Sequence, residues 1–474
     1  MRIHQVISQR LDLTLGRKLS DSGNYVDVIT GPNGCGKTEL LEILLQYATP
    51  YQSRPNQSNL WPVVHATGML KRVVVQTFSP FSRFYAPKAD VTLLTERYTE
   101  EDVEQNKYVC AGLHRSSRSV GATLSRKVLE EALIRLSEIP ESAETLFAVL
   151  YELGFQTRFN LVYKMKAGFK HAFESNDPIR FIELHLQDMQ NKVRLRPSEA
   201  KILREFYSGK GDEFLGVLSH SIGVVRDHHD PRAKVYILPI SLQNVKRDFH
   251  VIQAFALLRR LELLNLTSCE LRGNEVESID VAKTSSGQQQ MLCAIFGLAT
   301  SITPDCLVLL DEPELSLHPE WQLKYVDALF RIARSVHNVH IVVATHSPLV
   351  VQQAVFHGAD VIRMGDDGTR YSTHPLPMLS DTRLSIEQAL VDVFHTPIAD
   401  SAHVSNEIFQ AVVMGETGDW AEKSEALAKL DQLGKIYRDE KDGTTAQLVR
   451  DAIRLINTPD TPPPLSGDVG QSLG

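Results

Sequence analysis

A glycine-rich loop between a strand-like run and a helix-like run constrains the fold of this chain more than any other feature. The residues from Gly31 to Thr38 read GPNGCGKT and fit the spacing G-x-x-x-x-G-K-[S/T]. The run NYVDVIT before them is rich in β-branched and alternating apolar residues, which predicts a strand. A helix is predicted from about Lys37, because four leucines share one helical face: Leu40, Leu41, Leu44 and Leu45. A strand, a glycine loop and a helix in this order predict an α/β fold.

A loop of this kind is suited to hold a triphosphate. Glycines let backbone N–H groups approach phosphate oxygens closely, and the N-terminus of the following helix adds the positive end of its dipole. We expect Asn33, Gly34 and Gly36 to surround the phosphates. Lys37 is expected to reach the terminal phosphates, and the Thr38 hydroxyl to ligate Mg²⁺. The alternative, a glycine-rich turn without a ligand, is disfavoured because a strand and a helix both flank the loop.

Two further apolar runs predict buried parallel strands that end in polar residues. They are CLVLL, from Cys306 to Leu310, and VHIVVAT, from Val339 to Thr345. Asp311 and Glu312 directly follow the first run, at the edge where parallel sheets carry ligands. Asp311 is suited to hold Mg²⁺, directly or through water, and Glu312 to polarise an attacking water as general base. Acidic residues also end strands in ordinary loops, but a neighbouring phosphate loop favours the chemical role.

Composition narrows the class of protein and its compartment. The chain has 474 residues with 43% hydrophobic and 23% charged residues, which is typical of globular proteins with more than one domain. It has no apolar run long enough to cross a bilayer, and its first residues lack an apolar signal core. The five cysteines show no paired spacing, as in a reducing compartment. We therefore expect a cytoplasmic protein without a membrane span. The net charge of −8 gives no global attraction to nucleic acid.

Further motifs follow in the order found in ABC-type ATPases, a family that this chain resembles. The signature-like run KTSSGQQQM contains Ser285, Ser286, Gly287 and Gln288 at the family positions. The other matches are Gln76 after VVV at the Q-loop position, Asp311-Glu312-Pro313 at the acidic pair, ELSLHP at the D-loop and His346 in ATHSP at the switch-histidine position. The chain departs from the commonest signature, because Thr284 replaces leucine and Ser286 replaces the first glycine. The order of the motifs, more than any single one, carries the resemblance.

The resemblance implies a composite site for ATP and Mg²⁺, built by two copies of the chain. Ser285, Gly287 and Gln288 of one copy would contact the nucleotide held by the other copy. His346 would hold the γ-phosphate within its own copy and would act in catalysis together with Glu312. Gln76 would sense Mg²⁺ and the attacking water. ATP would then join two surfaces and hydrolysis would release them, which is a switch based on differential affinity.

Within this family, DEPELSLHPEWQ and ATHSPLV resemble the soluble SMC-like, RecF-like and OLD-like ATPases. QTFSPFSRF and the regions outside the core resemble the PtuA-like ATPase of Septu-type and retron-associated antiphage systems. This resemblance implies a regulatory ATPase in antiviral defence, acting as a dimer or a higher oligomer built from dimers. Its partner would be a separate effector such as an HNH-type nuclease. A RecF-like or SMC-like ATPase that clamps DNA is the alternative, and a transporter's soluble ATPase is a weaker one.

The expected organisation has a divided ATPase core. Residues 1–90 and 234–380 form its two halves, 91–233 a helical insert, 381–457 a helical region for partner docking, and 458–474 a disordered tail. Basic residues recur in the insert and are candidates for a DNA or RNA groove, although solvated helix faces explain most such runs. These residues are Arg115, Arg118, Arg126, Lys164, Lys166, Lys170, Lys192, Arg194 and Arg196.

Overall fold

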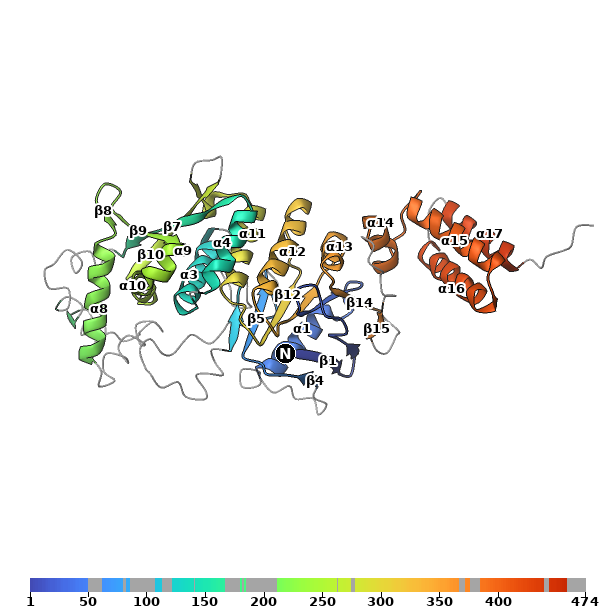
Figure 1. The fold of residues 1–474 in the computed structure, drawn as a ribbon, viewed down its shortest axis with the longest axis horizontal. Helices are drawn as coiled ribbons and strands as arrows, with labels where there is room; N and C mark the ends of the chain where they lie inside the picture. The colour runs from blue at the N-terminus through green and yellow to red at the C-terminus, as the bar shows by residue number, and fades with distance from the viewer. Residues whose placement is uncertain are drawn as a thin grey trace, which may run out of the picture. The chain divides into compact units, whose positions relative to one another are not determined.

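The fold is described from a computed structural model of the chain. The described residues are 1–49, 62–79, 82–85, 107–112, 122–139, 141–166, 180, 183–184, 211–261, 263–273, 278–365, 371–375, 384–438 and 443–457. The chain divides into two compact units, Met1–Arg383 and Leu384–Gly474, which are considered one at a time (Figure 1). The expected disordered tail, residues 458–474, lies outside the described residues, as does much of the expected insert.

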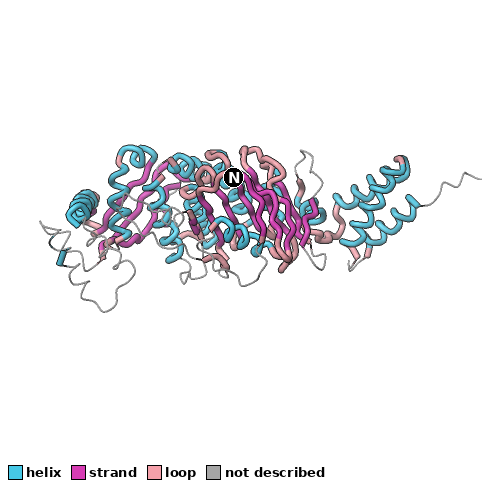
Figure 2. The backbone as a smooth tube through the Cα atoms, turned by 90° about the horizontal axis from the view of Figure 1, so that it is seen from below, coloured by secondary structure: helices cyan, strands magenta, loops and turns pink. Residues whose placement is uncertain are grey.

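A mostly parallel sheet forms the centre of the first unit. Its strands are β1 (Arg2–Ile7), β2 (Leu11–Thr14), β3 (Tyr25–Thr30), β4 (Val63–Thr67), β5 (Arg72–Thr77), β6 (Tyr108–Cys110), β12 (Cys306–Asp311), β13 (His340–Ala344), β14 (Asp360–Met364) and β15 (Tyr371–Pro375). Among the described residues the strand order is β4-β1-β2-β15-β14-β3-β13-β12-β5-β6. Neighbours from β14 to β6 are parallel, whereas β1 pairs antiparallel with β2 and β4. The predicted α/β class is confirmed, and Figure 2 shows the strands in magenta.

Helices cover both faces of this sheet. Those that pack near it are α1 (Lys37–Ala48), α11 (Ser286–Ala299), α12 (Pro319–Arg334) and α13 (Pro348–Phe356). On one face, Leu40 of α1 joins Val75 and Leu309 in a single apolar core. Burial of each fully buried leucine side chain of α1 contributes roughly 2 kcal/mol to the free energy of folding. Gln76, the neighbour of Val75, points to the opposite face, where the hydroxyl of Tyr325 in α12 donates to its Oε1 atom. The central strands are thus covered on both faces, which explains their continuous apolar runs.

A second sheet and its helices complete the first unit. The strands are β7 (Phe155–Met165), β8 (His229–Asp230), β9 (Val235–Ser241), β10 (Leu264–Gly273) and β11 (Ile279–Asp280), in the order β11-β10-β7-β9-β8. The helices are α3 (Ala122–Glu138), α4 (Ser142–Glu152), α8 (Gly211–Arg226), α9 (Leu242–Arg247), α10 (Phe249–Arg260) and the 3-10 turn η2 (Val281–Lys283). The expected helical insert therefore also contains β7. This strand pairs with β9 and β10, which lie beyond the insert in sequence, so its form depends on distant partners.

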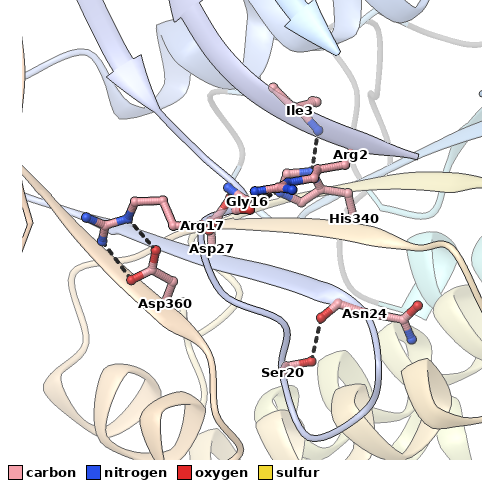
Figure 3. A network of polar contacts seen from close by, with 9 residues as sticks. All are labelled: Arg2, Ile3, Gly16, Arg17, Ser20, Asn24, Asp27, His340 and Asp360. Carbon is pink, nitrogen blue, oxygen red and sulfur yellow. Dashed lines mark hydrogen bonds and ion pairs between the residues drawn. The ribbon is translucent and has the colours of Figure 1, made fainter. Parts of the chain in front are cut away.

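A buried polar network fixes the two strands that lead to the glycine loop and to His346 (Figure 3). Oδ2 of Asp27, on β3, accepts from the Gly16 N–H at 2.7 Å and from His340 Nε2 at 2.8 Å. The Ile3 N–H donates to His340 Nδ1 at 3.0 Å, so the ring proton lies on Nε2. Because Ile3 lies on β1 and β13 begins at His340, the network joins β1, β3 and β13 within the sheet.

The second unit is helical in its described residues, as predicted. Its helices are α14 (Ile386–Gln388), the π-helical turn η3 (Ala389–Val393), α15 (Ala402–Thr417), α16 (Trp420–Ile436) and α17 (Thr444–Asn457). The last three share one apolar core, which includes Ile408, Leu430 and Val449. Across both units, no helix among the described residues is long and apolar enough to span a bilayer.

Candidate active site

The glycine loop connects β3 to α1 in a backbone conformation that requires glycine. A Cβ atom on Gly31 would lie 2.4 Å from the carbonyl oxygen of Met364 at the end of β14, so no side chain fits there. Gly36 caps α1 in the left-handed region, with φ 94°, and no side chain accepts from the first N–H groups of the helix. Asn33 and Gly34 are exposed at the crest of the loop. The backbone N–H groups of the glycine loop and of the first turn of α1 are suited to bind an anion such as a phosphate.

Lys37 is held over the loop by weak acceptors. Its ammonium group donates to the carbonyl oxygens of Gly31 at 3.0 Å and Pro32 at 3.1 Å. Burial lowers the pKa of Lys37, while the Cys35 thiol and the carboxylates of the acidic pair act in the opposite direction. A phosphate oxygen would accept more strongly than a neutral carbonyl, because a charged acceptor strengthens the bond. The position therefore fits the predicted phosphate-binding role.

Thr38 and Asp311 bring two hard oxygen atoms together, one from α1 and one from the end of β12. The Thr38 hydroxyl donates to Oδ1 of Asp311 at 3.2 Å. Burial, and then the neighbouring Glu312 carboxylate, raise the pKa of Asp311 to about 6. A hydroxyl and a carboxylate in this arrangement fit Mg²⁺, which prefers oxygen ligands. A bound cation would also favour the ionised form of Asp311.

Glu312 and His346 lie side by side at the ends of β12 and β13. Glu312 has φ 48°, in the left-handed region, and its N–H donates to the Ala344 carbonyl at 2.9 Å. Such a conformation costs about 1–3 kcal/mol in a residue other than glycine and is typical of functional sites. Nε2 of His346 is 3.9 Å from Oε1 of Glu312, beyond hydrogen-bond reach. Burial and then the nearby Lys37 cation lower the pKa of His346, against the opposing effect of Glu312, which favours the neutral imidazole.

Comparisons with known proteins give a family match and a named relative. Residues 167–352 match the family described as "AAA domain, putative AbiEii toxin, Type IV TA system". The "Retron Vc95 probable ATPase" of Vibrio cholerae serotype O1 biovar El Tor is 22% identical over 368 residues, which cover 70% of this chain and 68% of that protein. The chain therefore carries a match to an AAA-type ATPase domain. The family match includes the signature, the acidic pair and His346, and the glycine loop precedes it.

Solved structures give only distant matches to this chain. The Smc head domain of Pyrococcus furiosus, bound to the C-terminal domain of ScpA, is 11% identical with a TM-score of 0.31, covering 80% of this chain and 96% of that one. A structure described as "an inward-facing conformation of a putative metal-chelate type ABC transporter" is 12% identical with a TM-score of 0.27, covering 84% and 90%.

Gln76 is buried in the fold, and both ends of its side-chain amide are hydrogen-bonded. Its Nε2 atom donates to the carbonyl oxygens of Ala294 at 3.1 Å and Ala111 at 3.4 Å, and its Oε1 atom accepts from Tyr325 at 2.9 Å. These bonds join β5 to α11 and α12. A role in sensing Mg²⁺ remains a prediction and would require this side chain to exchange partners.

The signature residues form the exposed tip of α11. Ser285 and Gln288 make a capping box, in which the Ser285 hydroxyl accepts from the Gln288 N–H at 3.3 Å. Both side chains are exposed. A Cβ atom on Gly287 would lie 3.2 Å from the Ser316 carbonyl oxygen in the D-loop. The tip of α11 therefore rests on the D-loop of its own chain, and contact with a nucleotide in a second copy remains a prediction.

Glu314 is a residue of the site that sequence reasoning missed. It was expected only as the first residue of the D-loop, but one of its oxygens accepts from the His346 N–H at 2.8 Å. The signal available in the sequence is a second glutamate placed directly after the acidic pair and proline.

We predict that Asp311→Asn stabilises the metal-free chain. Because burial raises the pKa of Asp311 from 3.8 to about 6, this group lowers the stability as the pH rises through that interval. The variant should gain roughly 2–3 kcal/mol at pH 7.5 in urea unfolding without Mg²⁺, and the gain should shrink as the pH falls below about 6. Stabilisation by MgATP should disappear in the same variant.

The matched control is Asp305→Asn at the opposite end of β12. Asp305 is paired with Lys71, and hydrogen bonds from Lys71 and Asn338 lower its pKa. This control should gain no stability at pH 7.5 and should keep the response to MgATP. An Asp311→Asn protein that is no more stable than the wild type at pH 7.5 would argue against a carboxylate whose ionised form burial disfavours.

Proposed function

We propose that this chain binds ATP with Mg²⁺ and hydrolyses ATP in a site that a second copy of the chain completes. The observation that carries the proposal is the convergence of five side chains at one sheet edge: Lys37, Thr38, Asp311, Glu312 and His346. They come from the start of α1, which follows β3 and the glycine loop, and from the ends of β12 and β13, which are neighbours in the sheet. In open parallel sheets, ligands bind at this edge.

Each of these residues has a role that follows from its position. Lys37 and the N–H groups at the start of α1 bind the phosphates. Thr38 and Asp311 would hold Mg²⁺, which supplies charge neutralisation on the phosphate oxygens. Glu312 accepts the proton of the attacking water, and the neutral imidazole of His346 donates from one ring nitrogen to the γ-phosphate. The left-handed backbone at Glu312 turns its carboxylate out of the strand, beside His346.

The exposed tip of α11 supports the role of a second copy. The Ser285 side chain is exposed at a helix N-terminus, where N–H and O–H donors favour an anion. Within its own chain, this tip contacts the D-loop through Gly287 and Ser316. An ATP molecule held by the glycine loop of one copy would accept from the Ser285 tip of the other. ATP binding would then join the copies, and hydrolysis would separate them.

Ser285→Arg tests the contribution of the second copy. Its longer, charged side chain would block the approach of the α11 tip to a partner, while Lys37 and Thr38 of its own chain are unchanged. We expect hydrolysis to fall by at least about 100-fold, as when a transition-state donor is lost, while one chain still binds a fluorescent ATP analogue. The matched control is Ser385→Arg, because Ser385 and Gln388 form an equivalent exposed capping box in the second unit. A Ser285→Arg protein with wild-type turnover would exclude the proposed contact.

We further propose that the ATPase controls a separate effector in antiphage defence, in the cytoplasm. The support is the similarity to an ATPase named for a retron. Large apolar side chains are exposed on the second unit, including Phe409 on α15 at 67%, Trp420 on α16 at 85% and Leu455 on α17 at 51%. These exposed aromatic and leucine side chains are the candidates for contact with a protein partner.

The partner is tested by purifying the native chain from its source cells with and without ATP. A smaller nuclease should co-purify with the wild type and should be lost with Phe409→Asp, while ATP hydrolysis is retained. A chain that stays alone in both conditions would argue against the effector. DNA binding that requires ATP and weakens steeply with salt would instead support the DNA-clamping alternative. Of the basic residues proposed for such contact, only Arg126, Lys164 and Lys166 lie in the part that the structure describes.

A further inference from the structure

A carboxylate after the acidic pair is bonded to the backbone of the switch histidine. Oε1 of Glu314 accepts from the Thr345 hydroxyl and from the His346 N–H, both at 2.8 Å. Its other oxygen, Oε2, is buried without a hydrogen-bond partner. A buried carboxylate with two close donors restrains the segment that supplies them. Glu314 therefore fixes the backbone from which the His346 imidazole extends toward Glu312.

The same segment is held a second time from α12. The Ser347 N–H donates to the Thr345 hydroxyl at 2.9 Å, and the Ser347 hydroxyl donates to Oε1 of Gln322 at 2.6 Å. The Nε2 atom of Gln322 then donates to the Leu317 carbonyl oxygen at 3.1 Å, which returns to the D-loop. With the bonds of Glu314, these contacts form a closed ring between the D-loop and residues 345–347.

The ring is also connected to the tip of α11. The Gln290 side chain donates to the Leu315 carbonyl oxygen, one residue beyond Glu314. Gly287 lies against the Ser316 carbonyl oxygen, and Ser316 has φ 65°, in the left-handed region. A shift of the α11 tip would therefore move the D-loop, and the D-loop carries Glu314. Packed segments with few alternative arrangements transmit such shifts over short distances.

We propose that Glu314 is a positioning residue that sets the place of His346 beside Glu312 and links it to the tip of α11. This inference rests on the proposed function, because it assumes that the site hydrolyses ATP. Contact of the α11 tip with a second copy would then change the position of His346 in the same chain. Glu314 does not reach the nucleotide in this role, so it affects turnover more than ATP affinity.

Two substitutions at Glu314 separate positioning from chemistry. Glu314→Ala removes the acceptor for both donors, and we expect kcat to fall by about 10–100-fold while the Kd for ATP changes by less than about threefold. Glu314→Gln keeps an oxygen at Oε1, so it should restore kcat to within about threefold of the wild type. A Gln variant as slow as the Ala variant would contradict positioning, because a carboxylate that acts as a base cannot be replaced by an amide.

The coupling is tested by combining Glu314→Ala with His346→Ala. If Glu314 acts through His346, single-turnover rates of the double variant should equal those of His346→Ala alone. Additive losses would overturn the proposal, as would Glu314→Ala with a wild-type kcat.

Thr345→Val is the second variant if Glu314→Ala fails to fold, and it should lower kcat by about 3–10-fold. A wild-type chain that does not hydrolyse ATP would refute the proposed function. An active wild type whose Glu314 variants are equally active would refute only the positioning role of Glu314.

Discussion

Glu312→Gln should bind ATP as the wild type does but hydrolyse it at least about 100 times more slowly. The amide keeps the size of the side chain, yet it does not accept a proton from the attacking water. The left-handed backbone at this position and the bond to Ala344 do not depend on the carboxylate, so the site should keep its shape. Phosphate release measures turnover, and light scattering in the presence of ATP should show a long-lived dimer.

Glu320→Gln is the matched control for that variant. Glu320 is exposed on α12, where its carboxylate pairs with Lys324 on the helix surface, and its replacement should leave turnover unchanged. Glu312→Gln with a normal rate of phosphate release would show that another group accepts the proton. A slow variant that fails to bind ATP would show that the substitution damages the pocket.

Lys37→Ala should lose productive ATP binding. The Lys37 ammonium lies in the glycine loop, bonded to two carbonyl oxygens that a phosphate oxygen would replace. Each charge-assisted bond of this kind contributes about 1.5–3 kcal/mol, and the three N–H donors of the ammonium can bond more than one phosphate oxygen, so affinity should fall by at least about 100-fold. Thermal stabilisation by MgATP measures the loss directly, because a ligand that binds only the folded state raises its stability.

Lys71→Ala is the control for Lys37→Ala. Lys71 is exposed at the opposite end of the sheet, before β5, and pairs with Asp305. Its replacement should keep the full response of the melting temperature to MgATP. An unchanged response in Lys37→Ala would mean that the glycine loop does not hold the phosphates.

Local pattern was sufficient for the elements that carry the site. β3, α1, β12 and β13 were predicted because their apolar residues form short continuous runs or one helical face. In the structure the three strands are buried along almost their whole length and α1 buries one face, as their apolar residues predict. Their order along the chain also indicated that Lys37 and Asp311 would meet at one edge, where the Thr38 hydroxyl now contacts Asp311.

Features that depend on distant partners were not visible in the sequence. β7 becomes a strand through pairing with β9 and β10, so its own residues did not separate it from the helical insert. Gln76 follows an apolar run, as a Q-loop residue would, but its bonds to Ala294 and Tyr325 come from α11 and α12. The contact between Glu314 and the His346 backbone likewise joins two separate loops.

Mixing two inactive variants tests the shared site most directly. Lys37→Ala chains keep an intact α11 tip, and Ser285→Arg chains keep an intact glycine loop, so a mixed pair contains one complete site. Each variant alone should be inactive, and an equal mixture should recover roughly a quarter of the wild-type rate of phosphate release, because about half of the pairs would be mixed. A mixture as inactive as its two components, or a Ser285→Arg chain that hydrolyses ATP alone, would contradict the proposal that one copy supplies the glycine loop and the other the helix tip.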